Sequence, residues 1–250
     1  MIHLGFFFGC NHVILQTARG LAHLCRMSSQ RLRPTMTTRI ALIHALSHSV
    51  APVNDAMQAL WPEAVRMNLL DDSLSADLAR SVNGLDRVME DRFLALAGYA
   101  MATGAQGLLF TCSAFGTCID AVAQRYPHLP VFKPNEAMVK DAAATGLPVG
   151  LIASFQPTLD SMPQEFPAGV LMGVELAGGA LDALNRGEHD VHDESVVQAA
   201  LRLKARGAQV IALAQFSMAR SKPLVMERTG LPVLTTVDSA VLALRLSLTA

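Results

Sequence analysis

Apolar and polar positions follow two alternating patterns along most of this chain. From Ile40 onward, short apolar runs flanked by small polar residues alternate with longer segments whose apolar residues recur at helical spacing. Such runs are typical of buried parallel strands, and the segments between them of crossover helices. The pattern predicts a doubly wound α/β protein with strands at residues 40–45, 64–68, 107–111, 131–133, 149–154, 169–174, 210–213 and 233–236.

Three helical segments stand out. Residues 196–206 carry an apolar face and end at Gly207, which suits a helix C-terminus. Residues 81–102 form a second long helical region with a charged outer side, and residues 239–248 predict a last helix that crosses back to the first part of the chain.

The chain nearly repeats itself. Residues 104–115 begin with Gly-Ala-Gln and run through an apolar stretch to Thr-Cys-Ser, and residues 207–218 repeat this pattern. Overlaying the copies sets Cys112 opposite Gln215. A second match joins residues 129–131 to residues 231–233. We therefore expect two pseudo-symmetric lobes, each a parallel sheet flanked by helices, with the active cleft between them.

The repeat also predicts where the lobes meet. Residues 39–46 resemble residues 148–155, so the second half should begin just before Pro148. The expected organisation is an N-terminal extension at 1–38 that is not part of the core, a first lobe at 39–145 and a second lobe at 146–250.

The N-terminal segment has a distinct composition. No acidic residue precedes Asn54, whereas residues 19–39 include five arginines. This is typical of an organellar presequence. An upstream extension is the interpretation we favour, because Met36 leads directly into the first predicted strand. In either case Cys10 and Cys25 are expected to carry no chemistry.

Composition narrows the function classes. The formal net charge of -1 gives no electrostatic reason to expect nucleic acid or an anionic membrane as a partner. The longest uncharged stretch, residues 93–119, is interrupted by glycines, which argues against a membrane span. Four cysteines without paired spacing indicate a reducing, cytoplasmic environment. Small α/β proteins rich in apolar residues often dimerise, and a homodimer is expected on this general ground alone.

Polar residues follow several predicted strands, where open parallel sheets bind ligands. They offer hydroxyls and amides, which suits a small carboxylate held by these groups and by backbone N–H groups at helix N-termini. The predicted substrate-binding residues are Ser47, Thr111, Ser113, Asn135, Thr158, Phe216 and Ser217.

Cys112 is the candidate catalytic residue. It ends an apolar strand between two hydroxyl residues, and a helix is predicted to begin directly after it, which should favour the thiolate. Such a thiol can act as an acid/base group or as a nucleophile. The alternative is a small buried hydrophobic residue, as many free cysteines are, and this is what we expect of Cys118.

These features resemble the aspartate/glutamate racemase superfamily, which includes hydantoin racemases, maleate isomerases and arylmalonate decarboxylases. The resemblance covers residue 39 to the C-terminus and rests on the doubled layout, the Thr-Cys-Ser strand end and its counterpart in the second half. It implies cofactor-independent chemistry at a carbon next to a carboxylate. Racemases of the superfamily use two cysteines, one on each face of the substrate. Here Gln215 stands in place of the second, which argues against a symmetrical two-thiol reaction.

Other titratable residues receive secondary roles. His48 and Glu136 are possible acid/base groups, whereas a buried structural role is expected for His44. Asp238, which matches Glu136 in the repeat, is expected to cap a helix. His189, Asp190, His192 and Asp193 form a cluster that we expect to face solvent without binding metal.

Three functions remain open. The first is a cofactor-independent racemase or isomerase that acts on a small carboxylic acid through Cys112, with Gln215 facing it. The second is a one-thiol decarboxylase or cis–trans isomerase. The third is a carboxylate-binding protein that has lost catalysis.

Overall fold

The computed structural model describes residues 37–82 and 84–249 of the 250-residue chain. The predicted N-terminal extension lies outside the described residues except for Thr37 and Thr38, and Cys10 and Cys25 lie outside them as well.

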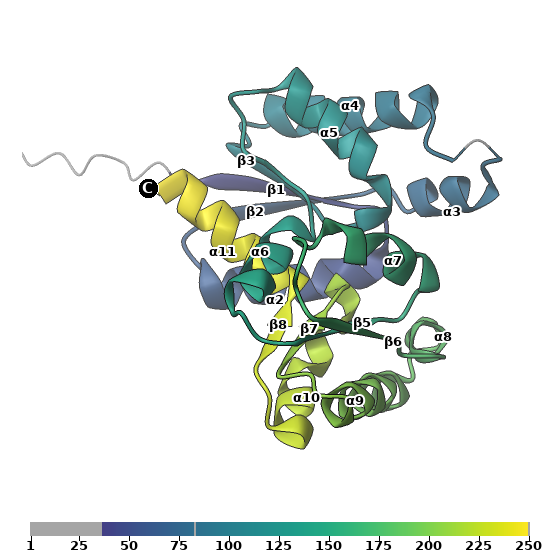
Figure 1. Cartoon of the computed structure of the whole chain (residues 1–250). Helices are drawn as coiled ribbons and strands as arrows, with labels where there is room; N and C mark the ends of the chain where they lie inside the picture. The colour runs from purple at the N-terminus through teal and green to yellow at the C-terminus, as the bar shows by residue number, and fades with distance from the viewer. Residues whose placement is uncertain (1–36, 83, 250) are drawn as a thin grey trace, which may run out of the picture. The chain divides into compact units, whose positions relative to one another are not determined.

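The described chain contains two parallel sheets (Figure 1). The first sheet has the order β2-β1-β3-β4, and the second has the order β6-β5-β7-β8. Each sheet thus places the first strand of its half beside both the second and the third. The bounds are β1 Arg39–His44, β2 Val65–Leu70, β3 Gly107–Phe110, β4 Val131–Phe132, β5 Val149–Ala153, β6 Met172–Leu176, β7 Val210–Leu213 and β8 Val233–Thr235. The predicted α/β class with two sheet-containing lobes is confirmed.

The predicted strands agree with these bounds to within one or two residues except at β6. The sequence pattern placed this strand at residues 169–174, whereas it spans Met172–Leu176. Gly169 lies in a turn with φ +91°, a left-handed conformation that precludes strand pairing there. The apolar run that predicted this strand therefore includes the turn at Gly169, and the strand itself begins three residues later.

Helices and 3-10 helices fill the segments between strands. They are η1 Ser47–Ser49, α2 Val50–Leu60, α3 Ser73–Arg80, α4 Arg87–Ala102, η2 Ser113–Phe115, α5 Gly116–Arg125, α6 Glu136–Ala144, α7 Gln156–Ser161, η3 Met162–Glu165, α8 Ala180–Asn185, α9 His189–Ala205, η4 Phe216–Ser221, α10 Lys222–Thr229 and α11 Thr236–Thr249. The helix predicted at 81–102 begins only at Arg87, because the Asp86 carboxylate accepts a hydrogen bond from the Met89 N–H at 2.9 Å and caps α4.

The repeated Gly-Ala-Gln segment forms the same turn in both halves. Gly104 and Gly207 follow α4 and α9 with φ angles of +86° and +97°. After each turn, the glutamine N–H donates a hydrogen bond to a carbonyl at the start of the first strand of its sheet. In the first half, Gln106 N–H bonds to the O of Arg39, the first residue of β1, at 2.8 Å. In the second half, Gln209 N–H bonds to the O of Pro148, the residue before β5, also at 2.8 Å. The sequence repeat is thus reproduced in backbone geometry.

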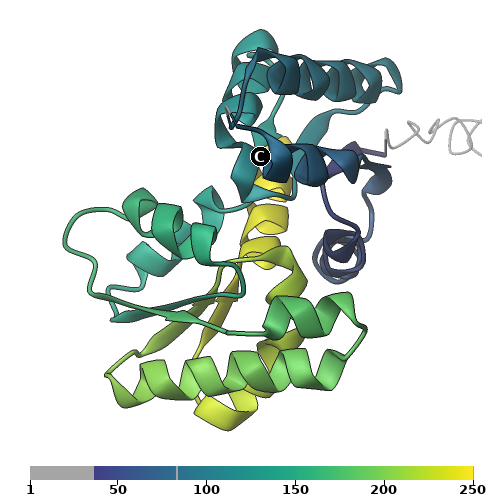
Figure 2. The ribbon, with the colours of Figure 1, turned by 90° about the vertical axis from the view of Figure 1, so that its right-hand side faces the viewer.

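Two helices pack against the sheet of the other half. In α6, Met138, Val139 and Ala142 join a core cluster with residues of β5 and β7. In α11, Val237, Val241 and Leu244 join a cluster with Ile40, Leu42 and Leu109 of the first sheet. The last helix therefore crosses back from the second sheet to the first, as predicted. Helices α4 and α5 cover the outer side of the first sheet, and α9 and α10 cover the outer side of the second (Figures 1 and 2). Packing of α6 on the second sheet was not predicted.

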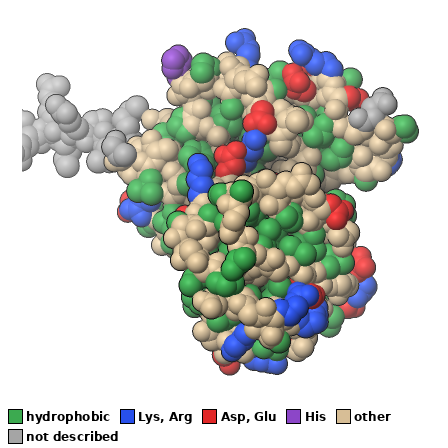
Figure 3. All heavy atoms as spheres, viewed as in Figure 1, with side chains coloured by type: hydrophobic (Ala, Val, Ile, Leu, Met, Phe, Trp, Pro, Cys, Tyr) green, Lys and Arg blue, Asp and Glu red, His purple; other side chains and the backbone are tan. Residues whose placement is uncertain are grey.

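On the face seen in Figure 3, basic and acidic side chains are interspersed. Within the described residues, no helix combines the length and apolar character needed to cross a bilayer.

Candidate active site

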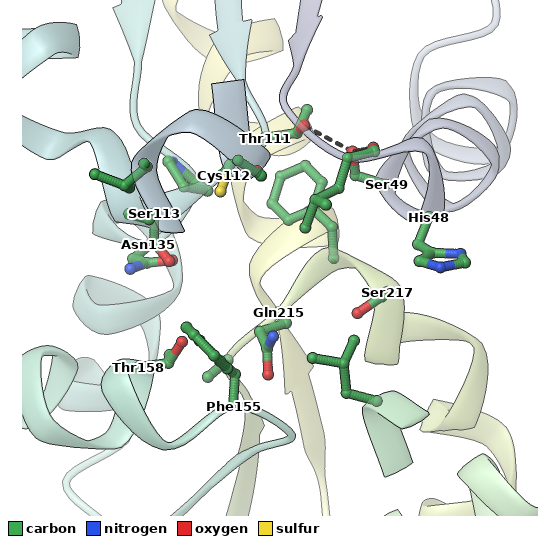
Figure 4. Close-up of a pocket in the computed structure, with 18 of the residues that line it drawn as sticks. His48, Ser49, Thr111, Cys112, Ser113, Asn135, Phe155, Thr158, Gln215 and Ser217 are labelled. Carbon is green, nitrogen blue, oxygen red and sulfur yellow. Dashed lines mark hydrogen bonds between the residues drawn. The ribbon is translucent and has the colours of Figure 1, made fainter. Parts of the chain in front are cut away.

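A cavity of about 310 Å³ lies beyond the carboxyl ends of the strands and is lined from both sheets (Figure 4). Loops after β1, β3 and β4 line it from one side, and loops after β5 and β7 line it from the other. The sequence-predicted residues that line it are His48, Thr111, Cys112, Ser113, Asn135, Thr158, Gln215, Phe216 and Ser217. We refer to this cavity as the cleft pocket.

Two predicted site residues do not line the cleft pocket. Ser47 begins η1 and is exposed, and its side chain borders a neighbouring hollow instead. Glu136 begins α6 and turns toward Lys133, with Oε1 3.6 Å from Nζ, in another adjoining hollow. A strand-end loop has two sides, and the sequence pattern does not tell which of them faces the cleft.

Cys112 follows β3 and has extended backbone angles, with φ −127° and ψ 120°. Its side chain is half-buried and borders the cleft pocket. The segment after it is held by Phe115, which is fully buried with its ring centroid 4.9 Å from that of Phe93. This anchor fixes the loop that carries the thiol.

Burial raises the pKa of the Cys112 thiol, and a hydrogen bond from Ala114 offsets this only in part. The net lowering of the pKa expected from a helix N-terminus is not found, because the cost of burying the thiolate exceeds the effect of the backbone hydrogen bond at the start of the short η2. A thiol with a raised pKa is protonated at neutral pH and is suited to donate a proton.

Gln215 lies across the pocket from Cys112 (Figure 4). Its Oε1 accepts hydrogen bonds from the Ser154 backbone N–H at 2.6 Å and from the Ser154 hydroxyl at 3.0 Å. Because a backbone N–H can only donate, the atom that faces it must be the amide oxygen. The amide nitrogen is then the end of Gln215 available to a ligand, as a hydrogen-bond donor.

A buried polar network lies beneath Thr111. The His44 ring is fully buried, with Nδ1 3.0 Å from both the Ser49 and Thr111 hydroxyls and Nε2 3.0 Å from Asn68 Oδ1. Burial lowers the pKa of His44, so its imidazole is neutral. His44 does not line the cleft pocket, and the structural role expected for it agrees with this position.

His48 borders the pocket at the side opposite Cys112 (Figure 4). Its Nε2 lies 2.9 Å from Asn185 Oδ1 at the end of α8. His48 and Cys112 are the two titratable side chains among the residues that line the cleft pocket, which include no Lys, Arg, Asp or Glu.

Two secondary expectations hold only in part. Asp238 lies in the first turn of α11, where its charge complements the helix dipole. Its carboxylate pairs with Lys222 at 2.7 Å, and the Thr235 hydroxyl accepts the hydrogen bond from the Asp238 N–H that caps α11. His192 does not face solvent but is fully buried, with Nδ1 2.8 Å from Asp193. It lies on the inner side of α9, which begins seven residues before the segment predicted from apolar spacing. In the described part of the chain, no three His, Cys, Asp or Glu side chains are placed so that they could hold a metal ion.

Sequence reasoning missed the apolar part of the pocket and the residue that orients Gln215. The additional lining residues include Leu46, Leu78, Ala79, Phe155 and Leu181. The repeat held a signal for two of them, because Leu46 and Phe155 occupy matching positions when residues 39–46 are laid over 148–155. Ser154, which binds Gln215, directly precedes Phe155 in the same matching segment.

The chain matches a family model along most of its length. The model describes Asp/Glu/hydantoin racemases and covers residues 48–244. The chain therefore belongs to the Asp/Glu/hydantoin racemase family, as the resemblance of its sequence indicated. A comparison with curated proteins finds none that matches this chain.

Solved structures share the fold at low sequence identity. A glutamate racemase isoform from Bacillus anthracis is 11% identical, with a TM-score of 0.65, over 85% of this chain and 82% of that one. Allantoin racemase from Klebsiella pneumoniae is 16% identical, with a TM-score of 0.63, over 85% and 88%. A mutant of arylmalonate decarboxylase is 17% identical, with a TM-score of 0.58, over 81% and 89%. At these identities the similarities establish the fold, and the reaction has to be inferred from the residues of the site.

Proposed function

We propose that this protein is a cofactor-independent enzyme of the racemase or isomerase type, which moves a proton at the carbon next to the carboxylate of a small acid through Cys112. The observation that carries the proposal is the position of one thiol on the wall of a pocket shared by both lobes, opposite an amide whose N–H donors are free to bind a carboxylate.

In the racemase-type reaction, the Cys112 thiol first passes its proton to the His48 imidazole through solvent, and the resulting thiolate takes the α-proton and leaves an enediolate. The Gln215 amide and backbone N–H groups stabilise the charge on its oxygens. A second acid then returns a proton to the opposite face. His48 is the other titratable side chain of the pocket lining, so we assign it this role. Cys112 ends as a thiol and His48 as a neutral imidazole.

A one-thiol decarboxylase is the second candidate, and the raised pKa of Cys112 favours it. In this reaction the bond to one carboxylate breaks, CO2 leaves, and the resulting enediolate takes the proton of the Cys112 thiol. Solvent then reprotonates the thiolate. This sequence needs a proton donor on one face only, so Gln215 in place of a second thiol is no obstacle.

Proton NMR in D2O tests both candidates with a panel of small 2-substituted carboxylic acids and malonates. Racemase-type chemistry places deuterium at the α-carbon of an otherwise unchanged acid, whereas decarboxylation releases CO2 and leaves deuterium in the shortened product. Cys112→Ala should abolish either signal, and Cys118→Ala, which removes a buried thiol outside the pocket, should retain it. Binding without exchange or CO2 release across the panel would instead favour a protein that has kept the pocket and lost catalysis.

A further inference from the structure

We propose that the cleft pocket selects a small carboxylic acid with an apolar substituent and discriminates against acids that carry a second carboxylate at the end of that substituent. The inference rests on the proposed function in placing the acid in this pocket, but it concerns binding and does not require turnover.

Large apolar side chains gather around the pocket without being covered by protein. Leu46 and Phe155 remain 43% and 45% exposed, although both line the cavity. They follow β1 and β5 at matching positions of the two halves, and Leu78 of α3 and Leu181 of α8 lie on the same lining. Exposed apolar side chains that converge on one cavity mark a site for an apolar group of a ligand.

The pocket has a polar part that suits one carboxylate. Gln215 offers its amide N–H groups, and Ser113, Thr158 and Ser217 offer hydroxyls. These neutral donors bind a carboxylate by hydrogen bonds alone. Thr111 and Ser49 are already bonded to each other at 2.8 Å and to His44, so they contribute less.

A second carboxylate finds no permanently charged partner in this pocket, because the residues that line it include neither Lys nor Arg. Lys133 faces the adjoining hollow, which shares Ser113 and Asn135 with the cleft pocket, but its Nζ is 2.6 Å from Asp120. A second carboxylate would therefore lose its water against Leu and Phe side chains without a partner, which is strongly unfavourable.

Calorimetric titration of the full chain carrying Cys112→Ser tests the proposal with matched pairs of acids. The pairs are butanoate and succinate, pentanoate and glutarate, 2-aminobutanoate and aspartate, and 2-aminopentanoate and glutamate. Each pair differs mainly in a terminal methyl group that becomes a carboxylate. We expect each added methylene of a monoacid to tighten binding up to about fourfold, and each diacid to bind at least about tenfold more weakly than its partner. Equal or tighter binding of the diacids, or no binding by any monoacid, would contradict the proposal.

A variant with a new cation provides the converse test. Phe155→Arg should weaken monoacid binding and strengthen glutarate and glutamate binding, reversing the preference within each pair. Leu171→Arg is the control, since Leu171 is 71% exposed and does not line the pocket. An unchanged preference in Phe155→Arg would count against the assignment of the apolar part. If monoacid binding holds while no acid exchanges deuterium, the proposed reaction fails and the substrate-class inference stands.

Discussion

Ser154 holds Gln215 by two hydrogen bonds to the same atom, from its backbone N–H at 2.6 Å and from its hydroxyl at 3.0 Å to Oε1. The residues come from the loops after β5 and β7, neighbouring strands of the second sheet. The bond from the backbone N–H fixes which end of the amide faces Cys112, so Gln215 presents donors to the cleft pocket. A cysteine at this position would present a proton-transfer group instead.

Gln215→Glu should weaken carboxylate binding. One carboxylate oxygen retains the bonds from Ser154, and the other replaces an N–H donor with a charged acceptor that repels the ligand. Loss of a hydrogen bond to a charged group corresponds to about 1.5–3 kcal/mol, so affinity should fall by roughly tenfold or more. Titration calorimetry with pentanoate measures this. Gln124→Glu, an exposed substitution in α5 that adds the same charge away from the pocket, should bind pentanoate as the unmodified chain does.

The raised pKa of Cys112 predicts late ionisation of its thiol. Thiolate absorbance near 240 nm, taken as the difference between the unmodified chain and Cys112→Ser, should appear above the ordinary thiol pKa of about 8.5. The folded state keeps this group protonated while the unfolded chain ionises it, so its contribution to stability is present below pH 8.5 and declines as pH rises through the folded-state pKa. A difference spectrum that titrates near neutrality would show a stabilised thiolate and favour proton abstraction over donation.

The lowered pKa of His44 predicts sensitivity to acid. The unfolded chain protonates this histidine near pH 6.5, whereas the folded chain keeps it neutral to a lower pH. The stabilising contribution is therefore present above pH 6.5 and is lost as pH falls toward the folded-state pKa. Urea unfolding between pH 7.5 and 5.5 should show the decline.

His44→Gln should reduce this decline. His192 is buried with a lowered pKa as well, so part of the decline should persist in the variant. Equal pH dependence in His44→Gln and in the unmodified chain would mean that His44 is not neutral in the folded protein.

Gly150 should not tolerate a larger residue. An added Cβ would lie 3.0 Å from the Ala208 Cβ and 3.1 Å from the Leu203 Cβ, atoms that side-chain rotation cannot move. Gly150→Ala should destabilise the fold by about 1–3 kcal/mol, because β5 and α9 must separate.

Gly116 provides the matched control for this glycine. A Cβ there meets nothing within 4 Å, and Gly116 begins α5 with φ −50°. Gly116→Ala should stabilise by about 0.4–1 kcal/mol. Chemical denaturation measures both, and equal effects of the two substitutions would contradict the packing described for β5 and α9.

The sequence predicted the two sheets well because the signal for each strand is local. Buried parallel strands are apolar throughout, and the Gly-Ala-Gln repeat marks the start of the third strand in each half. The packing of α6 on the second sheet had no such signal. An apolar face indicates that a helix is covered but not by which sheet, and the exchange of α6 and α11 depends on the three-dimensional arrangement.

The candidate site was predicted where strand ends carry polar residues and was incomplete elsewhere. Cys112 and Gln215 were found through the repeat, and both line the same pocket. Ser47 and Glu136 lie on similar loops but face neighbouring hollows. The apolar residues were missed because only the matching positions of Leu46 and Phe155 in the repeat pointed to them, and apolar character alone does not separate a pocket residue from a core residue. The protonation state of Cys112 was misjudged because burial outweighs the effect of the short η2.

The central claim is that the Cys112 thiol opens into the pocket where the acid binds. Peptide-resolved mass spectrometry of iodoacetamide labelling, at a pH where the Cys112 thiolate absorbance has appeared, tests it in the folded full chain, with and without saturating pentanoate. We predict that Cys112 is alkylated without ligand and protected by it, while Cys118, which belongs to α5 and is buried in a core cluster with residues of α4, is not alkylated under either condition. Labelling of Cys112 only after unfolding, or labelling that pentanoate does not slow, would contradict the account.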